Sequence, residues 1–334
     1  MSTDSSAAFL GRVERGIAAA VQADGLGEAV LAPAAAHLCL GTGAKRMRPQ
    51  LVRLLAEALG VGDEPAENVA VAAELIHAAS LLHDDVVDQG QTRRGRTTVN
   101  ATWGNAVAVL TGDWLLCGAL ARLRNHPQVV TAASVECVAM MSRAAIAEIQ
   151  ARGDLDLGEA GWRAIAEGKT GALLGFCGEA LAYTADRAEL VAPLRRFGRH
   201  LGAAFQLADD LADLFALQTG KDRFSDLKNR NPSLPLLRAA ADDASLRRRI
   251  DAAWAWPSVS EAAARELGEA VLASSAPADC AAQLDIELKT AAASLGPLRE
   301  AVWEPLREWA APLCAAVPDS PAGAPFPAPL RGAR

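Results

Sequence analysis

The hydrophobic positions of this chain recur at helical spacing along almost its whole length. Apolar residues return every three to four positions, and no stretch alternates apolar and polar residues as a half-buried strand does. Proline near the start and glycine at the end of several segments mark helix boundaries. The pattern predicts an all-α protein of about ten or more helices, over 46–60, 65–88, 103–124, 127–152, 159–183, 186–218, 233–256, 258–274, 277–295 and 298–315.

The helical pattern continues without a linker as far as residue 317. No Pro/Gly/Ser-rich stretch or charge block divides it, so residues 1–317 are predicted to form a single helical domain. Residues 318–334 contain five prolines and little that packs, which predicts a disordered tail. No repeat of 20–50 residues is present, which argues against a helical solenoid.

Composition supports a soluble helical protein. Hydrophobic residues make up 51% of the 334 residues and aromatic residues only 4%, which excludes a disordered chain and favours helix over strand. The formal charge is −7, so no general attraction to nucleic acid or to an anionic membrane is expected, and an anionic ligand needs a local basic cluster. The six cysteines form no CxxC pair and are predicted to be buried apolar residues. Without a signal peptide or a membrane-spanning stretch, a cytoplasmic location is expected.

A cluster of aspartates closes the apolar segment 65–88. Asp84 and Asp88, with Asp85 between them, are four residues apart and share a helix face, where like charges repel and the helix dipole disfavours anions. Carboxylates presented in this way suit a hard divalent cation, Mg²⁺ above all, which keeps ligand positions open for water and phosphate oxygens. The cluster therefore predicts a metal site, although a solvated acidic face explains one such cluster equally well.

The same D-D-x-x-D spacing returns at Asp209, Asp210 and Asp213, inside the apolar sequence LGAAFQLADDLADLFAL. Two copies of the spacing inside apolar helices favour metal binding over a solvated face. We expect the two clusters to face each other across one cavity and to hold several metal ions.

Basic residues complement the two clusters. They are Lys45, Arg46, Arg48, Arg93, Arg94, Arg96, Lys169 and Lys221. Any one of them alone is best explained as a surface residue, but together with Mg²⁺ they form the shell that a diphosphate requires. His77 lies two turns before Asp84 on nearly the same helix face. By itself it is better explained as a core histidine.

In this order the motifs resemble those of the trans-polyprenyl diphosphate synthases, which are chain-elongating prenyltransferases. The resemblance spans about residues 40–240 and rests on GAKRMRP, ELIHAASLLHDDVVDQGQTRRGRTTVN, WGNAVAVLTGDWLL, GKTGALLG, FQLADDLADLF and GK…DL…SLP. It implies a bundle of mostly antiparallel helices around a central cavity, and a homodimer. The implied substrates are isopentenyl diphosphate and an allylic diphosphate.

The resemblance also implies a role for each motif residue. Three Mg²⁺ ions per active site would be ligated by Asp84, Asp88 and Asp209, and the shell completed by Asp85, Asp210 and Asp213. The allylic diphosphate would be held by Arg93, Lys169, Gln206 and Lys221. Isopentenyl diphosphate would be held by Lys45, Arg48, His77 and Arg94. Thr170, between Gly168 and Gly171, would offer oxygen lone pairs to the allylic cation at an irregular helix turn.

The implied reaction begins when the allylic C–O bond ionises; the isopentenyl double bond then attacks the cation and a proton is lost. The growing tail should follow the helix of the first motif, so Ala79 and Ser80, one turn before Asp84, would form its floor. In this family bulky aromatic residues at the matching positions stop the tail early. Small residues here predict a product longer than farnesyl, from geranylgeranyl to long-chain, unless deeper residues such as Leu75 and Ile76, or a side chain from another helix, close the tunnel.

The chain departs from the family pattern in the segment that follows the second aspartate motif, between Gly220 and Pro235. Asn231 stands where the family has a lysine, although Lys228 or Arg230 is near enough to reach the same phosphate. In the family's G-K-x-x-G-x-D pattern, this chain has Phe224 in place of the second glycine. These differences affect the lid over the allylic diphosphate.

Two other functions stay open. A terpene cyclase or diphosphate lyase on the same scaffold has no use for the residues proposed for isopentenyl diphosphate. A regulatory subunit of a heteromeric synthase has no need of two intact aspartate motifs. This sequence has both the residues for isopentenyl diphosphate and two intact aspartate motifs, and both features favour elongation.

Overall fold

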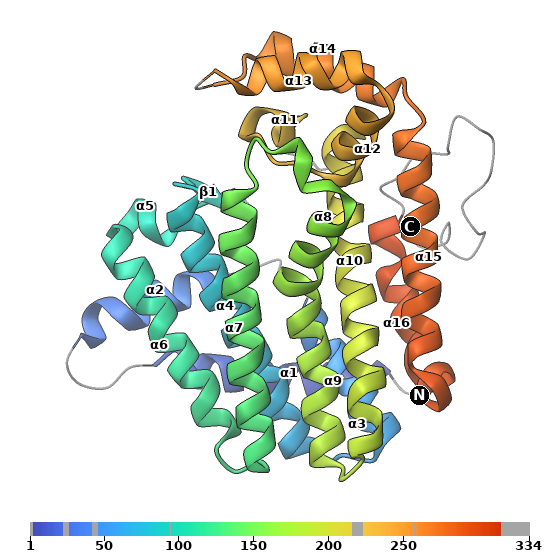
Figure 1. Cartoon of the computed structure of the whole chain (residues 1–334). Helices are drawn as coiled ribbons and strands as arrows, with labels where there is room; N and C mark the ends of the chain where they lie inside the picture. Colours follow the sequence, from blue (N-terminus) through green and yellow to red (C-terminus); the bar gives the residue numbers. More distant parts are fainter. Residues whose placement is uncertain are drawn as a thin grey trace. The chain divides into compact units, whose positions relative to one another are not determined.

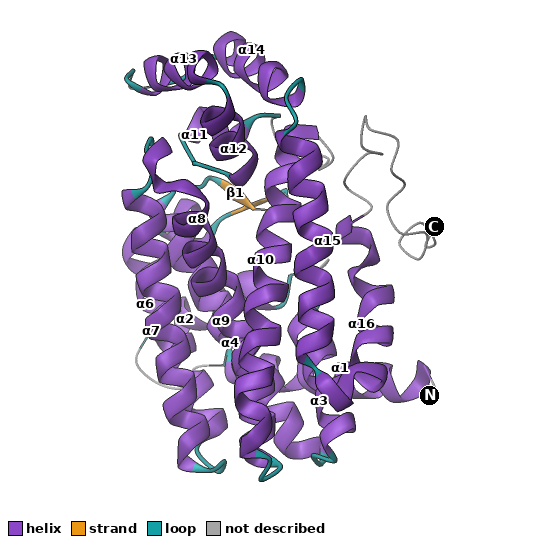
Figure 2. Cartoon of the chain, turned by 45° about the vertical axis from the view of Figure 1, so that its right-hand side comes forward, coloured by secondary structure: helices purple, strands orange, loops and turns teal. Residues whose placement is uncertain are grey.

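The computed structural model describes residues 3–22, 27–41, 46–93, 95–215, 223–256 and 258–314, with side chains from residue 6 to residue 307. These residues are helical nearly throughout, which confirms the predicted all-α class (Figures 1 and 2). Within these ranges the strands are two-residue segments, β1 (Thr92–Arg93) and β2 (Arg96–Thr97), which pair antiparallel.

The chain divides into two compact units. Unit 1 comprises Met1–Val138 and Phe176–Ala192, and unit 2 comprises Ala139–Gly175 and Pro193–Arg334. The single domain predicted over 1–317 stays a prediction, and the predicted tail 318–334 lies outside the described residues.

Unit 1 contains α1 (Thr3–Ala20), α2 (Glu28–Cys39), α3 (Met47–Leu59), α4 (Asp63–Val87), the two strands, α5 (Val99–Trp103) and α6 (Asn105–Leu123). Unit 2 contains η1 (Leu155–Leu157), α8 (Gly158–Ala166), the π-helical turn η2 (Glu167–Gly171), α11 (Ser225–Asn229), α12 (Leu234–Asp242), α13 (Ala244–Trp254), α14 (Glu261–Leu272), α15 (Ala276–Ser294), η4 (Gly296–Leu298) and α16 (Arg299–Cys314). α7 (Gln128–Gln150), α9 (Ala172–Thr184) and α10 (Val191–Phe215) each contribute residues to both units, and η3 (Ala188–Leu190) belongs to unit 1.

Helix α4 is the centre of unit 1. It packs against α1, α3 and α6, and its residues are buried almost continuously from Val69 to Ala79. A helix that is apolar on every side is stable only when other helices surround it. The small side chains among these residues, such as Ala72 and Ala73, let the neighbouring helices approach closely. The first aspartate motif is the end of this buried helix.

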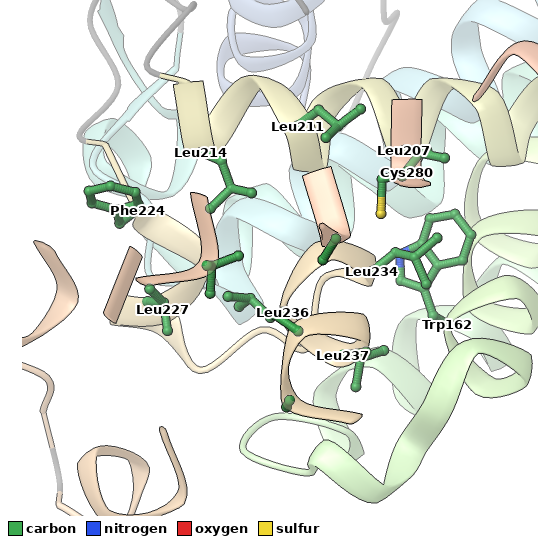
Figure 3. Close-up of a cluster of buried hydrophobic side chains, with 14 of the residues drawn as sticks. Trp162, Leu207, Leu211, Leu214, Phe224, Leu227, Leu234, Leu236, Leu237 and Cys280 are labelled. Atoms are coloured by element: carbon green, nitrogen blue, oxygen red, sulfur yellow. The ribbon is translucent and has the colours of Figure 1, made fainter. Parts of the chain in front are cut away.

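The core of unit 2 forms around α10 (Figure 3). Leu207, Leu211 and Leu214 recur at helical spacing on its buried face and are fully buried. The side chains packed with them include Trp162, Phe224, Leu227, Leu234, Leu236, Leu237 and Cys280. This apolar packing holds the helix that carries the second aspartate motif.

Glycines bring the η2–α9 segment into backbone contact with α10. A Cβ built on Gly198 lies 2.1 Å from the backbone nitrogen of Gly175, and one built on Gly202 lies 2.3 Å from the Cα of Gly171. No side chain fits at such distances, so only glycine allows this approach. The contact fixes the π-helical turn against α10.

Several predicted boundaries are wrong for identifiable reasons. The helix expected over 233–256 breaks at Asp243, whose carboxylate accepts the backbone N–H groups of Ser245 (2.7 Å) and Leu246 (3.1 Å) and so caps α13. The helix expected over 103–124 begins at Asn105, because Gly104 has φ 88°. Helices α1 and α2 were not predicted.

The cysteine prediction holds for most of the thiols and fails for one. Four cysteines are buried as expected, namely Cys39, Cys137, Cys177 and Cys280. Cys117, on α6, is exposed, so the prediction was wrong there. Burial raises the pKa of the Cys177 thiol to about 12, so that it stays protonated and behaves as an apolar residue.

Helices α6 and α7 carry unusually apolar surfaces. By length and composition both are able to cross a membrane, and 33% of each apolar window is buried inside the protein. On α6 the exposed large apolar residues include Val109, Leu110 and Leu120.

Gly198→Ala should destabilise the protein by about 1–3 kcal/mol or more, because the new methyl group meets backbone rather than a movable side chain. Urea unfolding followed by circular dichroism measures the change. Gly11→Ala is the matched control, because its Cβ would lie 3.7 Å from the Arg15 side chain in open helix and should leave stability equal or higher. Equal unfolding free energies for Gly198→Ala and the parent would contradict the proposed backbone contact.

Candidate active site

The first aspartate motif closes helix α4 in unit 1. α4 begins with Asp63 and Glu64, where the helix dipole favours acidic side chains, and ends with the motif, where the dipole disfavours them. The backbone N–H of Asp88 donates to the carbonyl oxygen of Asp84 at 2.8 Å. Asp84 is half-buried, Asp88 is exposed and Asp85 is buried. The three carboxylates of one motif therefore have three different environments.

Arg93, in β1, holds the buried carboxylate of Asp85. Its Nε donates to Oδ1 at 3.0 Å and to Oδ2 at 3.1 Å, and its Nη2 donates to Oδ1 at 2.8 Å. Asp85 is only 6% exposed, and the planar guanidinium is well suited to pair with such a carboxylate. The contact fixes the direction of the Arg93 side chain, which stays 31% exposed.

The loop between this motif and the β-hairpin is tied by hydrogen bonds. The N–H of Gly90 donates to the carbonyl of Asp85 at 2.9 Å. The carbonyl of Gly90 accepts from Thr98 Oγ1 at 2.7 Å and from Asn100 Nδ2 at 3.1 Å. These bonds keep the hairpin, and with it Arg93, close to the end of α4.

His37 of α2 anchors the far side of the hairpin and was missed by the sequence analysis. Its Nε2 lies 2.7 Å from the carbonyl oxygen of Thr97, and its Nδ1 lies 3.1 Å from Nη2 of Arg96. A carbonyl oxygen only accepts, so Nε2 is assigned the proton and Nδ1 accepts from the arginine. The ring also packs edge-on against Trp103.

Arg46 organises the start of α3. Its guanidinium binds Glu14 of α1, donates to Glu74 of α4 at 2.7 Å and donates to the carbonyl of Cys39 at 2.7 Å. Arg46 has a left-handed backbone, with φ 45°. Sequence analysis found no role for the two glutamates, because their partner is distant along the chain. The network fixes the turn from which Arg48 extends.

The residues predicted to bind isopentenyl diphosphate fall into two groups. Arg48, in the first turn of α3, and His77, on α4, are both half-buried in unit 1. Lys45 and Arg94 lie outside the described residues.

The second aspartate motif lies on α10 in unit 2. Asp209 is exposed, whereas Asp210 is 4% exposed. Asp210 accepts three hydrogen bonds from the protein: from the indole of Trp162 at 2.8 Å, the backbone N–H of Leu234 at 3.0 Å and the amide of Gln206 at 3.0 Å. Asp210 is the second aspartate of its motif, as Asp85 is of the first, and in both cases donors from the protein hold the carboxylate.

Asp213 caps helix α11. It accepts the backbone N–H of Ser225 at 2.9 Å and that of Asp226 at 3.2 Å, and it also binds the Ser225 hydroxyl. A carboxylate is favoured at a helix N-terminus because it meets unpaired N–H groups there. Asp213 is therefore tied to the segment that follows the motif.

Lys169 and Thr170 lie in the π-helical turn η2, which confirms the predicted helix irregularity. Such turns are frequent at functional sites. Lys169 forms an ion pair with Glu148 of α7, and the two side chains are 29% and 28% exposed. Glu148 was not predicted, because nothing in its local sequence distinguishes it from a surface residue.

A pocket of about 50 Å³ opens beside Asp210 in unit 2. The polar side chains that line it are Glu148, Gln206, Asp210, Asp226, Asn231 and Ser233. Burial raises the pKa of Asp210 to about 7, against the lowering effect of its three hydrogen bonds. Burial, followed by the negative charges of Asp210 and Asp213, raises the pKa of Asp226 well above its ordinary value.

This concentration of carboxylates fits a hard divalent cation. Like charges that disfavour one another's ionisation are stabilised when a cation neutralises them, and carboxylate oxygens are the donors that Mg²⁺ prefers. Within the described residues no group of three or more His, Cys, Asp or Glu side chains forms a preformed metal cage. The remaining ligands would therefore be water and phosphate oxygens, as is usual for Mg²⁺.

The departures from the family pattern have visible consequences in unit 2. Asn231, in place of a lysine, donates its amide to Asp226 at 3.4 Å. Lys228 forms an ion pair with Glu261 of α14, and Arg230 donates to the carbonyl of Trp254 at 3.4 Å. Lys221 lies outside the described residues.

The two residues predicted to limit product length lie on α4. Ala79 is fully buried. Ser80 is half-buried, and its hydroxyl donates to the carbonyl of His77 at 2.9 Å. That bond satisfies the hydroxyl within its own helix.

Comparison with known proteins identifies the class to which this all-helical chain with two aspartate motifs belongs. The polyprenyl synthetase family model matches residues 29–270. Since this is more than half of the 334 residues, the chain belongs to the polyprenyl synthetase family, which confirms the resemblance found in the motifs.

Curated relatives are prenyl diphosphate synthases with different products. The chain is 38% identical over 201 residues to the all-trans-nonaprenyl-diphosphate synthase (geranyl-diphosphate specific) of Rhodobacter capsulatus, which covers 59% of this chain and 62% of the relative. It is also 38% identical over 219 residues to the (2E,6E)-farnesyl diphosphate synthase of Mycobacterium tuberculosis, covering 63% and 60%. The chain thus spans about three fifths of the length of these curated relatives.

Solved structures confirm the fold. The decaprenyl diphosphate synthase from Rhodobacter capsulatus has a TM-score of 0.85 at 25% identity, covering 94% of this chain and 98% of that chain. The polyprenyl synthase from Caulobacter crescentus, complexed with calcium and isoprenyl diphosphate, has a TM-score of 0.82 at 29% identity, covering 94% and 95%.

Asp210 should make stability depend on pH. Its folded-state pKa of about 7 lies above its ordinary value, so the stability that it contributes is complete below about pH 4 and is lost as pH rises through 7. Asp210→Asn cannot titrate. We expect the stability difference between parent and variant to fall by more than about 1 kcal/mol from pH 4.5 to pH 8. Urea unfolding in EDTA measures this difference, and a constant value would contradict the buried, proton-binding Asp210.

Proposed function

We propose that this chain is a prenyltransferase that condenses isopentenyl diphosphate head to tail with an allylic diphosphate and forms a trans double bond. The product would be longer than farnesyl, from geranylgeranyl to long-chain. The observation that carries the proposal is common to both motifs. In each, the middle aspartate is buried and held by protein donors, Asp85 by Arg93 and Asp210 by Trp162. The aspartates proposed as metal ligands, Asp84, Asp88 and Asp209, are half-buried or exposed.

The more exposed aspartates of the two motifs are suited to ligate metal, because the buried aspartates beside them are already held by the protein. Asp84, Asp88 and Asp209 would hold Mg²⁺, three ions in all. Asp85, Asp210 and Asp213 would complete the shell, partly through water, while their hydrogen bonds to the protein orient the motifs. When bound, Mg²⁺ supplies the charge neutralisation that a departing diphosphate needs. The family likeness includes a polyprenyl synthase complexed with calcium and isoprenyl diphosphate, which supports a divalent cation in this role.

Arg93 and Lys169 would bind the allylic diphosphate together with Gln206 and Lys221. Arg93 and Lys169 are each oriented by a carboxylate in their own unit, namely Asp85 and Glu148. Each keeps about a third of its side chain exposed, so a phosphate can reach the charge. Cations that are oriented before the substrate binds stabilise developing charge without further reorganisation.

Isopentenyl diphosphate would bind to Lys45, Arg48, His77 and Arg94. Its own diphosphate stays attached throughout, so these residues need no metal. Ionisation of the allylic substrate then leaves a cation that the isopentenyl double bond attacks, and the oxygen lone pairs of Thr170 would face that cation. Water must be excluded, because a free carbocation is hydrolysed.

Retention of the isopentenyl diphosphate residues favours elongation over a terpene cyclase or diphosphate lyase. Two intact aspartate motifs likewise favour it over a regulatory subunit of a heteromeric synthase. The relatives at 38% identity are named as synthases of nonaprenyl and farnesyl diphosphate, which supports chain elongation and leaves product length to particular side chains.

We further propose a cytoplasmic homodimer that binds no nucleic acid and has no integral membrane segment. The exposed apolar residues of α6, with Leu110 at 60% exposed, are apolar surface that a second copy would cover. The acidic charge of −7 supports the absence of nucleic-acid binding.

The elongation activity is tested directly. Purified protein with Mg²⁺, farnesyl diphosphate and labelled isopentenyl diphosphate should give longer prenyl diphosphates, and EDTA should abolish them. Asp84→Ala and Asp209→Ala should each lower turnover by about 100-fold or more while circular dichroism stays unchanged. Asp63→Ala, an acidic residue at the other end of α4, is the control and should keep full turnover.

The products separate the alternatives. A hydrocarbon or alcohol formed without uptake of label indicates a lyase, and turnover only with a second subunit indicates a heteromeric enzyme. Near-normal turnover of either motif variant contradicts the metal assignment.

Ala79→Phe should shorten the product. Ala79 is fully buried on α4 one turn before Asp84, so an aromatic ring there would occupy the volume proposed for the tail. Thin-layer chromatography of the dephosphorylated products measures their length. Ser245→Phe, at an exposed position of α13, is the control. An unchanged length would mean that other residues form the floor.

A further inference from the structure

Glu287 of α15 is a buried carboxylate with three protein donors. It is 2% exposed. Its Oε1 accepts from the guanidinium of Arg163 and from Gln283 Nε2 at 2.7 Å, and its Oε2 accepts from His200 Nδ1 at 2.8 Å. Both oxygens are thus committed to groups inside unit 2. Glu287 follows residue 270, where the match to the family model ends, so no family motif accounts for it.

Two of the donors to Glu287 come from the helices that build the second aspartate motif, while Gln283 lies on α15 itself. Arg163 lies on α8, and His200 lies on α10, which also carries Asp210. The residue before Arg163 is Trp162, whose indole donates to Asp210 at 2.8 Å. Consecutive residues on a helix extend in directions about 100° apart. One turn of α8 therefore reaches Asp210 with one side chain and Glu287 with the next.

The same arginine also reaches the π-helical turn. Arg163 Nη1 lies 3.6 Å from Glu167, the first residue of η2. Lys169 and Thr170 follow within that turn. Glu287 is therefore connected, through one guanidinium, to the segment that carries two residues of the proposed site.

We propose that Glu287 is a positioning residue for the second aspartate motif and for η2. Through Arg163 and His200 it fixes α8 against α10, so that the indole of Trp162 stays on Asp210 and Lys169 keeps its place. An ordinary buried ion pair would stabilise the fold without this specific effect. The catalytic consequence rests on the proposed function, whereas the effect on Trp162 does not.

The geometry is tested without turnover. In protein labelled with ¹⁵N-tryptophan, the indole signal of Trp162 is assigned by its loss in Trp162→Phe. We expect Glu287→Gln to shift this signal and to raise its hydrogen-exchange rate about tenfold or more, because α8 is then no longer fixed against α10 and the indole no longer stays on Asp210. Asp285→Asn is the control, because Asp285 pairs with the exposed Lys289 on the same helix and should leave the signal unchanged. An unchanged Trp162 signal in Glu287→Gln would overturn the proposal.

Steady-state kinetics test the consequence for catalysis. Glu287→Gln should lower kcat about tenfold, the usual effect of removing a group that orients a site. The KM for isopentenyl diphosphate, whose proposed ligands lie in unit 1, should change less than twofold. A lowered melting temperature with unchanged kcat would mean a purely structural role and would overturn the proposal.

A replacement variant and the activity of the parent protein separate failure of the Glu287 proposal from failure of folding or of the elongation proposal. If Glu287→Gln does not fold, His200→Gln, at a part-exposed position, replaces it in both measurements with the same expected effects. If the parent protein makes no prenyl diphosphate, the elongation proposal fails, while the Trp162 signal still decides whether Glu287 positions α8.

Discussion

The structure depends on how negative charge is tolerated inside apolar helices. Each D-D-x-x-D motif buries one carboxylate, Asp85 in the first and Asp210 in the second, and a buried polar group is costly unless it is hydrogen-bonded. In both motifs the middle aspartate is stabilised by donors from elsewhere in its own unit: Arg93 for Asp85, and Trp162 with the backbone of Leu234 for Asp210. The buried carboxylates are thereby fixed by the protein, and the more exposed ones keep positions that a cation and a diphosphate can reach.

Backbone contact sets the second geometric constraint. Gly198 and Gly202 on α10 touch Gly175 and Gly171, and the turn that carries Lys169 adopts π-helical geometry at this contact. A π-helical turn redirects side chains relative to a regular helix. The cation on Lys169 is then oriented by Glu148, as Arg93 is oriented by Asp85. Two of the three cations proposed for the allylic diphosphate, Arg93 and Lys169, are thus held by carboxylates before any substrate binds.

Two relatives that are each 38% identical to this chain are named as synthases of nonaprenyl and of farnesyl diphosphate, so overall sequence identity does not determine product length. A small set of side chains must do so, and Ala79 on the buried face of α4 is the candidate that the sequence provides. The departures of this chain act elsewhere. Asn231 donates an amide to Asp226 where the family has a lysine, so one cation beside the acidic pocket is replaced by a neutral group. The proposed metal would then have a larger share of the charge to neutralise.

The sequence by itself determined the helical class, the aspartate motifs and the helix irregularity at Lys169, because periodicity, residue spacing and glycine placement are local properties. It missed the break at Asp243, where an aspartate capped a new helix instead of continuing the old one, and it missed α1 and α2. Tertiary structure alone decided that Asp85 and Asp210 are buried and held by the protein, and that Glu14, Glu74, Glu148 and Glu287 orient basic residues far along the chain. A glutamate whose partner is 21 to 124 residues away has no signature in its own neighbourhood, because only folding creates the contact.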